Sequence, residues 1–354
     1  MRRILPLAVL LFLVVVVERI TGITETRYYL TQLTMTAYYG MVIMGLCLLM
    51  GYAGQISLGH AGFFAMGGYL AGFMTTWDFS ALKSTSIGSA LMTVNLLASR
   101  KDLYGAEILY VHPWASCIIA VSFAAGVAWL VGGPVLKLKG HYLAMATLGL
   151  GIIVYRVVLG SAIFGEADGL SDIPGFKVLP GIEVSGRSSE RVSNYYLAWS
   201  MVTLSLAAML SLVNSRVGRA LRAIHGSEDA AKAMGVDTPR YKLRVFVLSA
   251  AMAALAGVML THYNGAIGPA QASVMASVRY VAIVAVGGMA SLWGTLTMGS
   301  ILNMLSLRGY FGSFDDAVFG TILIIIMLFA PDGILRVRPL AAVRRLFSRA
   351  EEDT

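Results

Sequence analysis

Three polar side chains, those of Gln55, Ser57 and His60, stand close together at the start of a long apolar segment. An amide, a hydroxyl and an imidazole can each donate and accept hydrogen bonds. In apolar surroundings such groups need partners, because an unpaired buried polar group costs free energy. Two interpretations are open. Either the three residues cap and hydrogen-bond the start of the helix that follows, or they line the polar part of a route for a solute.

The other chemistry-bearing residues form no catalytic or metal-binding pattern. His141, His225 and His262 each lack a second ligand at metal spacing. Cys47 and Cys117 fall inside apolar runs, where they indicate small buried hydrophobes rather than a disulfide. The motifs G-x-x-x-x-G-K-[ST], H-E-x-x-H and G-x-S-x-G are absent from the sequence. We expect no metal, no cofactor and no catalytic residue, so any ATPase that drives this protein must be another chain.

The composition is that of a polytopic membrane protein. Of the 354 residues, 57% are apolar and 13% are charged, about half the usual charged share, and the mean hydropathy is +0.74. The net charge of +8 does not indicate nucleic-acid binding, because the basic residues stand mostly between apolar runs. We expect one all-α transmembrane domain over 1–354, with about 8–9 spans of the length that a bilayer requires.

The basic residues between the apolar runs predict the topology. Two arginines precede the first run, and no small-x-small cleavage site follows it, so a retained span is expected rather than a signal peptide. The N-terminus, the loop 214–244 and the tail 331–354 are basic and expected in the cytoplasm, whereas 77–112 and 161–193 are expected outside. The predicted spans are 4–20, 30–50, 57–76, 113–135, 141–160, 194–213, 243–265, 277–307 and 314–330.

The segment 277–307 is expected to be broken or re-entrant. A single plain crossing would leave the arginine-rich tail outside, and Gly287, Gly288 and a turn at 291–294 interrupt the apolar run. Irregular backbone at membrane depth is tolerated only where protein or a water-filled cavity satisfies it. Gly287 and Gly288 therefore join Gln55, Ser57 and His60 as candidates for a translocation pathway. The alternative is one long tilted helix whose middle is made flexible by glycines.

Glycines and arginines inside the spans suggest two further roles. Gly68 and Gly72 have the G-x-x-x-G spacing that lets two helix backbones approach closely, so they are predicted to serve helix packing. Arg156 and Arg279 stand near the expected outer ends of their spans. Long basic side chains there extend to the membrane surface. The alternative is that they contact an anionic group of a substrate.

The basic loop 214–244 predicts two short helices. The segment 216–225 has apolar residues on one side and arginines elsewhere, the pattern of an amphipathic helix at a lipid surface. Ser227 is a suitable N-cap for a second helix over 228–234, which Gly235 would end. The loop is either an ordinary cytosolic connection ordered by its own charges or a docking element for a soluble partner.

Five pieces of the sequence resemble the permeases of branched-chain amino acid ABC transporters, in particular the longer of the paired permease subunits. The resemblance implies a second permease subunit, two cytoplasmic ATP-binding subunits and a periplasmic substrate-binding protein, around a multi-pass protein of the bacterial inner (plasma) membrane. The matching pieces are GYAGQISLGHAGFFAMGGY at 51–69, LKLKGHYLAMATLGLG at 136–151, SRVGRALRAIHGSEDAAKAMGV at 215–236, AVGGMASLWGT at 285–295 and LFAPDGIL at 328–335.

The resemblance also assigns the second loop helix the role of coupling helix, since EDAAKAMG is similar to the E-A-A-x-x-x-G pattern of ABC importers. The alanines, including Ala233, are expected to let the helix enter a groove, with a methionine as a flexible apolar anchor. Its acidic first turn is expected to meet basic residues at the rim of that groove. The residues assigned to coupling are Glu228, Asp229, Ala230, Ala231, Met234 and Gly235.

The expected function is that of a non-catalytic permease subunit of an ATP-driven importer for branched-chain amino acids or similar small polar solutes. The outer segments 77–112 and 164–175 depart from the family pattern, so urea, amides and other amino acids stay open as substrates. The alternative is a self-sufficient secondary transporter or channel, which would favour acidic groups at membrane depth. No Asp or Glu falls mid-span, and Asp315 and Asp316 stand at a span start. A membrane-embedded enzyme is the third interpretation.

Overall fold

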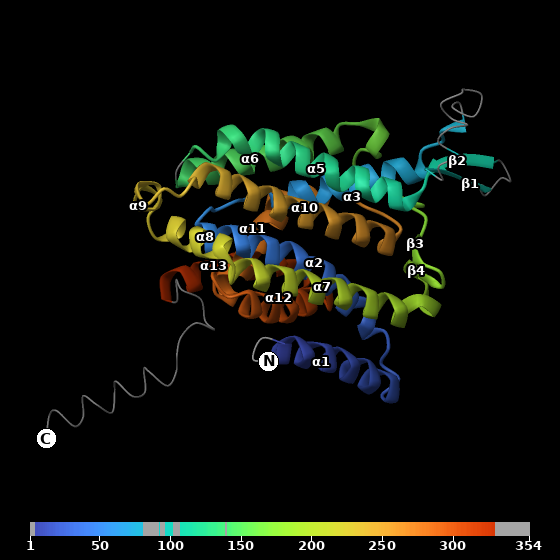
Figure 1. The fold of residues 1–354 in the computed structure, drawn as a ribbon. Coiled ribbons are helices and arrows are strands. Elements are labelled where there is room, and N and C mark those ends of the chain that lie inside the picture. Colours follow the sequence, from blue (N-terminus) through green and yellow to red (C-terminus); the bar gives the residue numbers. More distant parts are fainter. Residues whose placement is uncertain (1–3, 81–91, 93–95, 102–106, 139, 330–354) are drawn as a thin grey trace, which may run out of the picture.

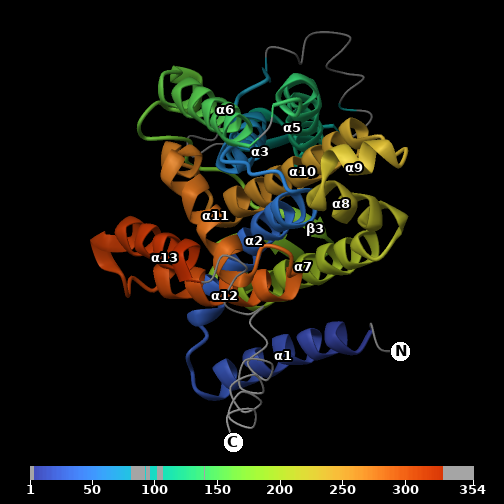
Figure 2. The same ribbon diagram turned by 90° about the vertical axis from the view of Figure 1, so that its left-hand side faces the viewer.

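Two long helices, α2 (Tyr29–Cys47) and α10 (Thr238–Asn264), form the centre of the computed structural model, which describes residues 4–80, 92, 96–101, 107–138 and 140–329 (Figure 2). Every residue from 41 to 53 is buried. A helix that is apolar on all sides is stable only when other elements surround it. Around this pair, α10 contacts α3 and α5, while α2 contacts α7 and α12.

Six of the described helices are long and apolar enough to cross a membrane. Besides the central pair they are α1 (Ile4–Ile23), α5 (Pro113–Val135), α6 (His141–Leu159) and α7 (Arg191–Val213). Shorter apolar helices occupy the other predicted spans, and the all-α polytopic membrane architecture is confirmed. These helices are α3 (His60–Thr76), α11 (Val274–Gly287), α12 (Leu292–Leu307) and α13 (Asp315–Phe329).

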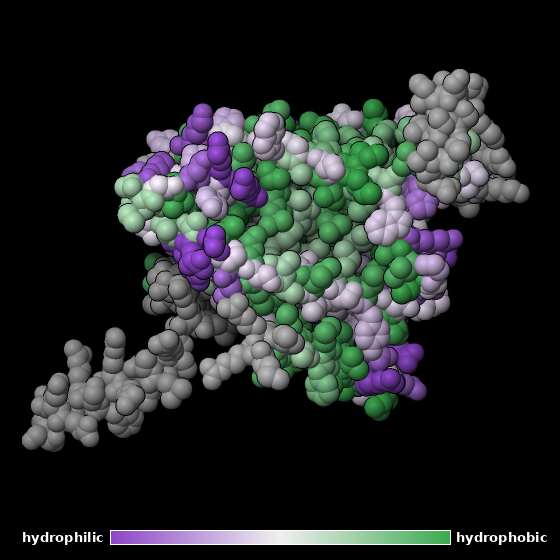
Figure 3. Space-filling view, viewed as in Figure 1, coloured by the Kyte–Doolittle hydropathy of each residue, from purple (hydrophilic) through white to green (hydrophobic). Residues whose placement is uncertain are grey.

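The two ends of the bundle differ in structure, with an apolar band between hydrophilic ends (Figure 3). One end, here called the α9 end, carries α8 (Arg216–Gly226) and α9 (Glu228–Ala233) (Figure 1). The opposite end, the hairpin end, carries two antiparallel hairpins. Their strands are β1 (Leu97–Lys101) with β2 (Glu107–Val111), and β3 (Phe176–Leu179) with β4 (Ile182–Val184).

The predicted break in 277–307 is confirmed, so the interpretation as one long tilted helix is wrong. Gly287 ends α11, and Gly288 has a φ of +90°, a left-handed conformation that glycine adopts without strain. The Ser291 hydroxyl then accepts a hydrogen bond from Gly294 N at 3.1 Å and caps α12. A Cβ on Gly287 would lie 2.4 Å from Thr295 Cα. The chain therefore turns back on itself, with two backbones in direct contact.

The predicted spans 30–50 and 57–76 are joined by irregular backbone. After α2 the chain forms a π-helical turn, η1 (Leu48–Tyr52), and then continues without regular structure from 54 to 59. Only at His60 does α3 begin, so the predicted span started three residues too early. With 17 residues α3 is about 26 Å long. Short 3₁₀ turns connect the other elements: η3 (Ala162–Phe164), η4 (Ser188–Glu190), η5 (Pro269–Ala272) and η6 (Gly312–Phe314).

Candidate functional site

The two short helices at the α9 end form as the sequence predicts. The Ser215 hydroxyl accepts a hydrogen bond from Val217 N at 3.1 Å and caps α8. Leu221 and Ile224 are buried on one side of α8, and the opposite side is basic and exposed. Such an amphipathic helix is fixed by its apolar side rather than by its own propensity. Its exposed basic residues are Arg216, Arg219 and Arg222.

Helix α9 begins at the predicted residue and ends at Ala233, one residue earlier than predicted. The Ser227 hydroxyl accepts a hydrogen bond from Ala230 N at 3.3 Å, which satisfies one of the free N–H groups at the helix start. At the other end Gly235 has a φ of +82°, and its N–H donates to Lys232 O. A Cβ at this glycine would meet nothing within 4 Å. The turn after α9 is therefore open to the outside and requires a residue that tolerates a left-handed backbone.

Glu228 anchors α9 to the start of α10. One carboxylate oxygen accepts from Lys242 Nζ at 2.7 Å, and the other accepts from Lys232 Nζ and Thr238 Oγ1, both at 3.1 Å. The Lys242 side chain is only 8% exposed. Burial alone would raise the pKa of Glu228, but the hydrogen bonds from Lys242 and Lys232 outweigh it and lower the pKa to about 2. Glu228 is therefore paired within the chain, and its contact with basic residues of a partner stays a prediction.

Replacing this anchor should lower stability in a pH-dependent way. In Glu228→Gln the nearly buried Lys242 loses its charged partner, and we expect a loss of about 1–3 kcal/mol at pH 7. Because the folded-state pKa is below the ordinary value of 4.5, the stabilisation is complete above pH 4.5 and is lost as the pH falls toward 2. Thermal unfolding in detergent should show a constant difference from the parent chain between pH 7 and 5. The difference should shrink as the pH falls below 4.5, and one that stays the same down to pH 3 would contradict the prediction. Asp229→Asn, at an exposed position, serves as the control.

The outer face of α9 is exposed and carries short side chains. Asp229, Ala230 and Ala233 are exposed, and the Met234 side chain is 85% exposed. Ala231 is 3% exposed and points toward the bundle, so it is not part of the outward surface that the sequence suggested. A bulky residue at Ala231 would lift the helix off the bundle, whereas one at Ala230 or Ala233 would change the outer face. The protruding methionine is the apolar group most open to a partner.

The polar cluster at the start of α3 is built into the core. His60 Nε2 lies 2.7 Å from the Ser249 hydroxyl of α10, and His60 Nδ1 lies 3.1 Å from the Ser57 hydroxyl. Thr147 Oγ1 of α6 accepts from Leu58 N at 3.1 Å. Ser249 is eleven residues into α10, which places the cluster about 17 Å from the start of that helix. These hydrogen bonds pair both ring nitrogens of His60 and one backbone N–H of the irregular segment, as burial deep in the bundle requires.

Gln55 differs from its two neighbours. Its side chain is 1% exposed, and neither amide atom has a hydrogen-bond partner among the described residues. An unpaired buried amide is costly and marks a place where a water molecule or a rearranged backbone can supply a partner. The structure thus divides the predicted cluster, with Ser57 and His60 bound to the core and Gln55 unpaired.

The two irregular segments of the chain contact each other near the α9 end. Tyr52 Oη donates to Ala290 O at 2.8 Å, and Cys47 Sγ donates to Met289 O at 3.2 Å. A Cβ on Gly51 would overlap Met289 O, so only glycine permits this contact. The π-turn after α2 therefore packs directly on the turn between α11 and α12, which is the location of the predicted pathway glycines Gly287 and Gly288.

Helix α8 contacts the same irregular segment. Gly54 has a φ of +68°, and a Cβ there would lie 3.0 Å from His225 Nδ1. A chain of contacts thus runs from α9 through α8 to the segment 54–59. Sequence reasoning missed Gly51, Gly54 and Ser249. The first two lie in the segment 51–69 that resembles the permease family, but the partner of His60 is 189 residues away.

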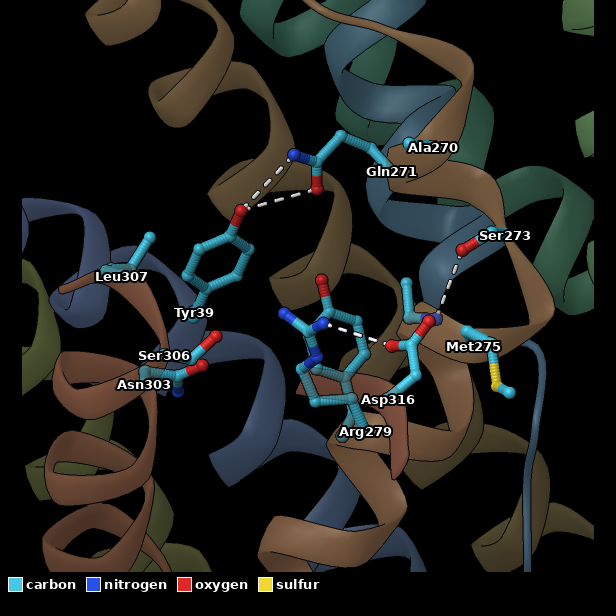
Figure 4. A pocket seen from close by; sticks show the side chains of 12 residues that line it. Tyr39, Ala270, Gln271, Ser273, Met275, Arg279, Asn303, Ser306, Leu307 and Asp316 are labelled. Atoms are coloured by element: carbon cyan, nitrogen blue, oxygen red, sulfur yellow. Dashed lines mark hydrogen bonds and ion pairs between the residues drawn. The ribbon is translucent and has the colours of Figure 1, made fainter. Parts of the chain in front are cut away.

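A cavity of about 250 Å³ lies between α2, η5, α11, α12 and α13. The Arg279 guanidinium reaches into its wall, with Nη2 3.2 Å from Asp316 Oδ1 and 3.7 Å from Asp315 Oδ2 (Figure 4). Across the cavity Tyr39 Oη and the Gln271 amide hydrogen-bond at 3.3 Å. Arg279 is therefore ion-paired within the chain, whereas Arg156 is exposed.

The predicted packing glycines lie at tight contacts. A Cβ on Gly68 would lie 2.4 Å from Thr261 Oγ1 of α10, and one on Gly72 would lie 2.9 Å from Ile173 Cδ1. The closest approach involves residues that the spacing did not indicate. A Cβ on Gly67 would lie 2.1 Å from Ala254 O, and one on Gly257 would lie 2.0 Å from Phe64 O. The backbones of α3 and α10 are thus nearly in contact along two turns.

Comparison with known proteins shows the family. Residues 28–330 match the model of the branched-chain amino acid transport system permease component. This chain belongs to that family. The match covers the central helices, the irregular segments and both short helices of the α9 end, so this permease carries every candidate site within the family domain.

Relatives of this permease extend over most of its length. LivM of Escherichia coli, a high-affinity branched-chain amino acid transport system permease protein, is 29% identical over 90% of this chain and 73% of its own. LivH of Salmonella typhimurium, with the same description, is 26% identical over 87% of this chain and 96% of its own. BraD of Pseudomonas aeruginosa is 26% identical over 88% of this chain and 97% of its own. No solved structure matches this permease.

Proposed function

We propose that this permease is one of two membrane subunits of an ATP-driven importer that moves branched-chain amino acids or similar small polar solutes into a bacterial cell. The observation that carries the proposal is α9, a short helix fixed by Glu228 to the end of α10 with its outer face bare. An isolated helix of six residues is not stable in water. Its rigid mounting outside the apolar band is what a docking element for a soluble ATPase requires.

The proposed partners follow from the relatives and from the surfaces. Escherichia coli has both LivM and LivH among the relatives of this chain, and each is described as a permease protein of a branched-chain amino acid transport system. A second permease subunit therefore completes the membrane part. Two ATP-binding subunits dock on the α9 end, and a periplasmic substrate-binding protein delivers solute to the hairpin end. The single transmembrane domain over 1–354 catalyses no reaction itself.

We propose that the protein lies in the bacterial inner membrane with its α9 end facing the cytoplasm. Four arginines and lysines of α8 and α9 stand at that end, and the positive-inside rule assigns such loops to the cytoplasm. The break between α11 and α12 adds a return crossing, which brings the C-terminal tail to the same side. A reporter fused after residue 349 should be active in its cytoplasmic form. Activity of a periplasmic reporter at that position would contradict the topology.

The translocation route is proposed to pass the irregular segments 54–59 and 287–291. Tyr52 binds the carbonyl of Ala290 and Thr147 binds the N–H of Leu58, so these segments can rearrange without breaking a long helix. Gln55, with its unpaired amide, supplies a polar group at this place. Movement of α9 reaches the route through the contact of α8 with Gly54.

Reconstitution tests the proposal against the alternative of a self-sufficient transporter. Proteoliposomes with this chain, a second permease subunit and the ATP-binding subunits should accumulate labelled leucine only with ATP on the α9 side and binding protein on the hairpin side. Omission of ATP-binding subunits should reduce uptake to the level of empty vesicles. Leucine accumulation by this chain alone, driven by an ion gradient, would establish the secondary-transporter function in its place.

A further inference from the structure

A second cavity, of about 290 Å³, lies at the α9 end between the end of α5 and the start of α10. Its walls differ in character. One wall is apolar and comes from α5 and α10, and the other is formed by basic side chains beside Glu228. The cavity joins residues of the apolar helices α5 and α10 to charged residues at the α9 end. Neither docking to an ATPase nor the proposed translocation route uses it.

The apolar wall is open because α5 ends in small residues. A Cβ on Gly133 would meet nothing within 4 Å, whereas one on Gly132 would lie 2.8 Å from Leu243 Cδ1. Pro134 lies inside the helix and cannot donate the usual backbone hydrogen bond. Gly133 and Pro134 are exposed, while Leu136 is buried behind them. The wall thus forms a shallow apolar groove that continues from the exposed apolar surface of α5, which includes Trp129 and Leu130.

The basic wall has an excess of positive charge. Lys137, Lys232 and Arg240 line it, and the facing carboxylate of Glu228 is already bound by Lys242 and Lys232. Arg240 pairs with Asp237 at 3.0 Å, but this pair is exposed at the surface, where ion pairs are weak. Lys137 forms no ion pair within the described part of the chain. The site therefore favours an anion.

We propose that this cavity binds the phosphate headgroup of an anionic phospholipid, with the adjoining acyl chain against Gly133, Leu136 and Leu243. The basic wall supplies Lys137, Lys232 and Arg240 to the phosphate. A free phosphate ion would leave the apolar wall in contact with water, whereas a lipid covers it. Basic pockets between helices at the cytoplasmic side of a membrane have the charge and depth that lipid headgroups require.

A lipid at this site would connect α9 to the membrane. Lys232 belongs to α9, Arg240 to α10, and Lys137 follows α5. One headgroup that contacts all three residues would link the end of α5, helix α9 and the start of α10 through a common ligand. Anionic lipid should therefore raise the thermal stability of the protein more than a zwitterionic lipid of equal chain length. This inference does not depend on the proposed transport function, because binding is measured on the chain itself.

The test measures binding of fluorescent phosphatidylglycerol and phosphatidylcholine to the purified full-length chain in detergent. Phosphatidylglycerol should bind tighter, and each cation removed should weaken it about five-fold. Lys137→Gln with Arg240→Gln should thus weaken phosphatidylglycerol binding about 25-fold without changing that of phosphatidylcholine. Gly133→Leu, which leaves the charge unchanged, should weaken binding by filling the groove. Circular dichroism and the thermal midpoint verify that each variant is folded.

The matched control is Arg216→Gln with Arg219→Gln, which removes the same charge from exposed positions of α8 at the same end. This control should bind phosphatidylglycerol like the parent chain. An equal loss in the control would overturn the proposal, because it would show general attraction by the basic end. Unchanged binding in Gly133→Leu, or displacement of the lipid by millimolar inorganic phosphate, would overturn the apolar part of the site and with it the assignment to a lipid.

Discussion

Gly235→Arg is expected to lower leucine uptake by the reconstituted transporter about ten-fold or more while ATP hydrolysis continues. The left-handed backbone at Gly235 disfavours any side chain by about 1–2 kcal/mol. Because a Cβ there meets nothing within 4 Å, the arginine side chain would project from the end of α9 into the surface on which the ATPase docks. A loss of about 1.4 kcal/mol in docking corresponds to a ten-fold loss of affinity.

Two matched variants separate the effect of a bulky side chain at residue 235 from the effects of added charge and of backbone strain. Gly235→Asn keeps a residue that tolerates a left-handed conformation, and it should retain most of the uptake. Gly226→Arg adds the same charge at the end of α8, where a side chain also meets open space, and it should retain coupling. Uptake and phosphate release are measured on the same proteoliposomes. Normal uptake by Gly235→Arg with its ATPase bound would show that α9 is not the coupling element.

Gly68→Leu is expected to prevent stable assembly of the bundle. A Cβ at this position would lie 2.4 Å from Thr261 Oγ1 and 2.5 Å from Ile267 Cδ1, with Gly257 O at 3.2 Å. Overpacking of a well-packed core costs about 1–3 kcal/mol, and here the neighbours include backbone that cannot move aside. We expect the amount of monodisperse protein after detergent extraction to fall several-fold.

Gly126→Leu is the control for this substitution, because it lies on a membrane-spanning helix at a position with no atom within 4 Å. It should yield as much monodisperse protein as the parent chain, measured by size-exclusion chromatography of a fluorescent fusion. If Gly68→Leu elutes and unfolds like Gly126→Leu, the contact of α3 with α10 is looser than the structure indicates.

Much of the helical architecture could be predicted from the sequence because it depends on local patterns. Apolar runs gave the spans, and serine caps with a following glycine gave α8 and α9 to within a residue or two. The hairpins at the other end were missed although one carried a signal. Pro180 and Gly181 separate two short strands, and Gly181 has a φ of +88°. Such a dipeptide between apolar segments is typical of a turn.

The candidate site was harder to predict, since its contacts join distant parts of the chain. Which way Glu228 faces depends on Lys242, fourteen residues later and on another helix. The spacing that indicated Gly68 could not show that Gly67 makes the tighter contact, because that depends on the rotation of α3 against α10. Pairings of this kind are set by tertiary packing, and the spacing of residues in a single sequence does not reveal them.

The direct backbone contacts at Gly51, Gly67, Gly257 and Gly287 also determine how force passes through the molecule. Flexible side chains between two helices can change rotamer, and each can thereby take up a small displacement of one helix against the other. At these four glycines no side chain separates the two backbones, and a close-packed interior transmits strain. Pairs of elements joined in this way must shift as single blocks. A displacement of the chain at Gly51 is therefore passed directly to the turn at Met289, and the bending is left to the short stretches of non-helical chain between the blocks.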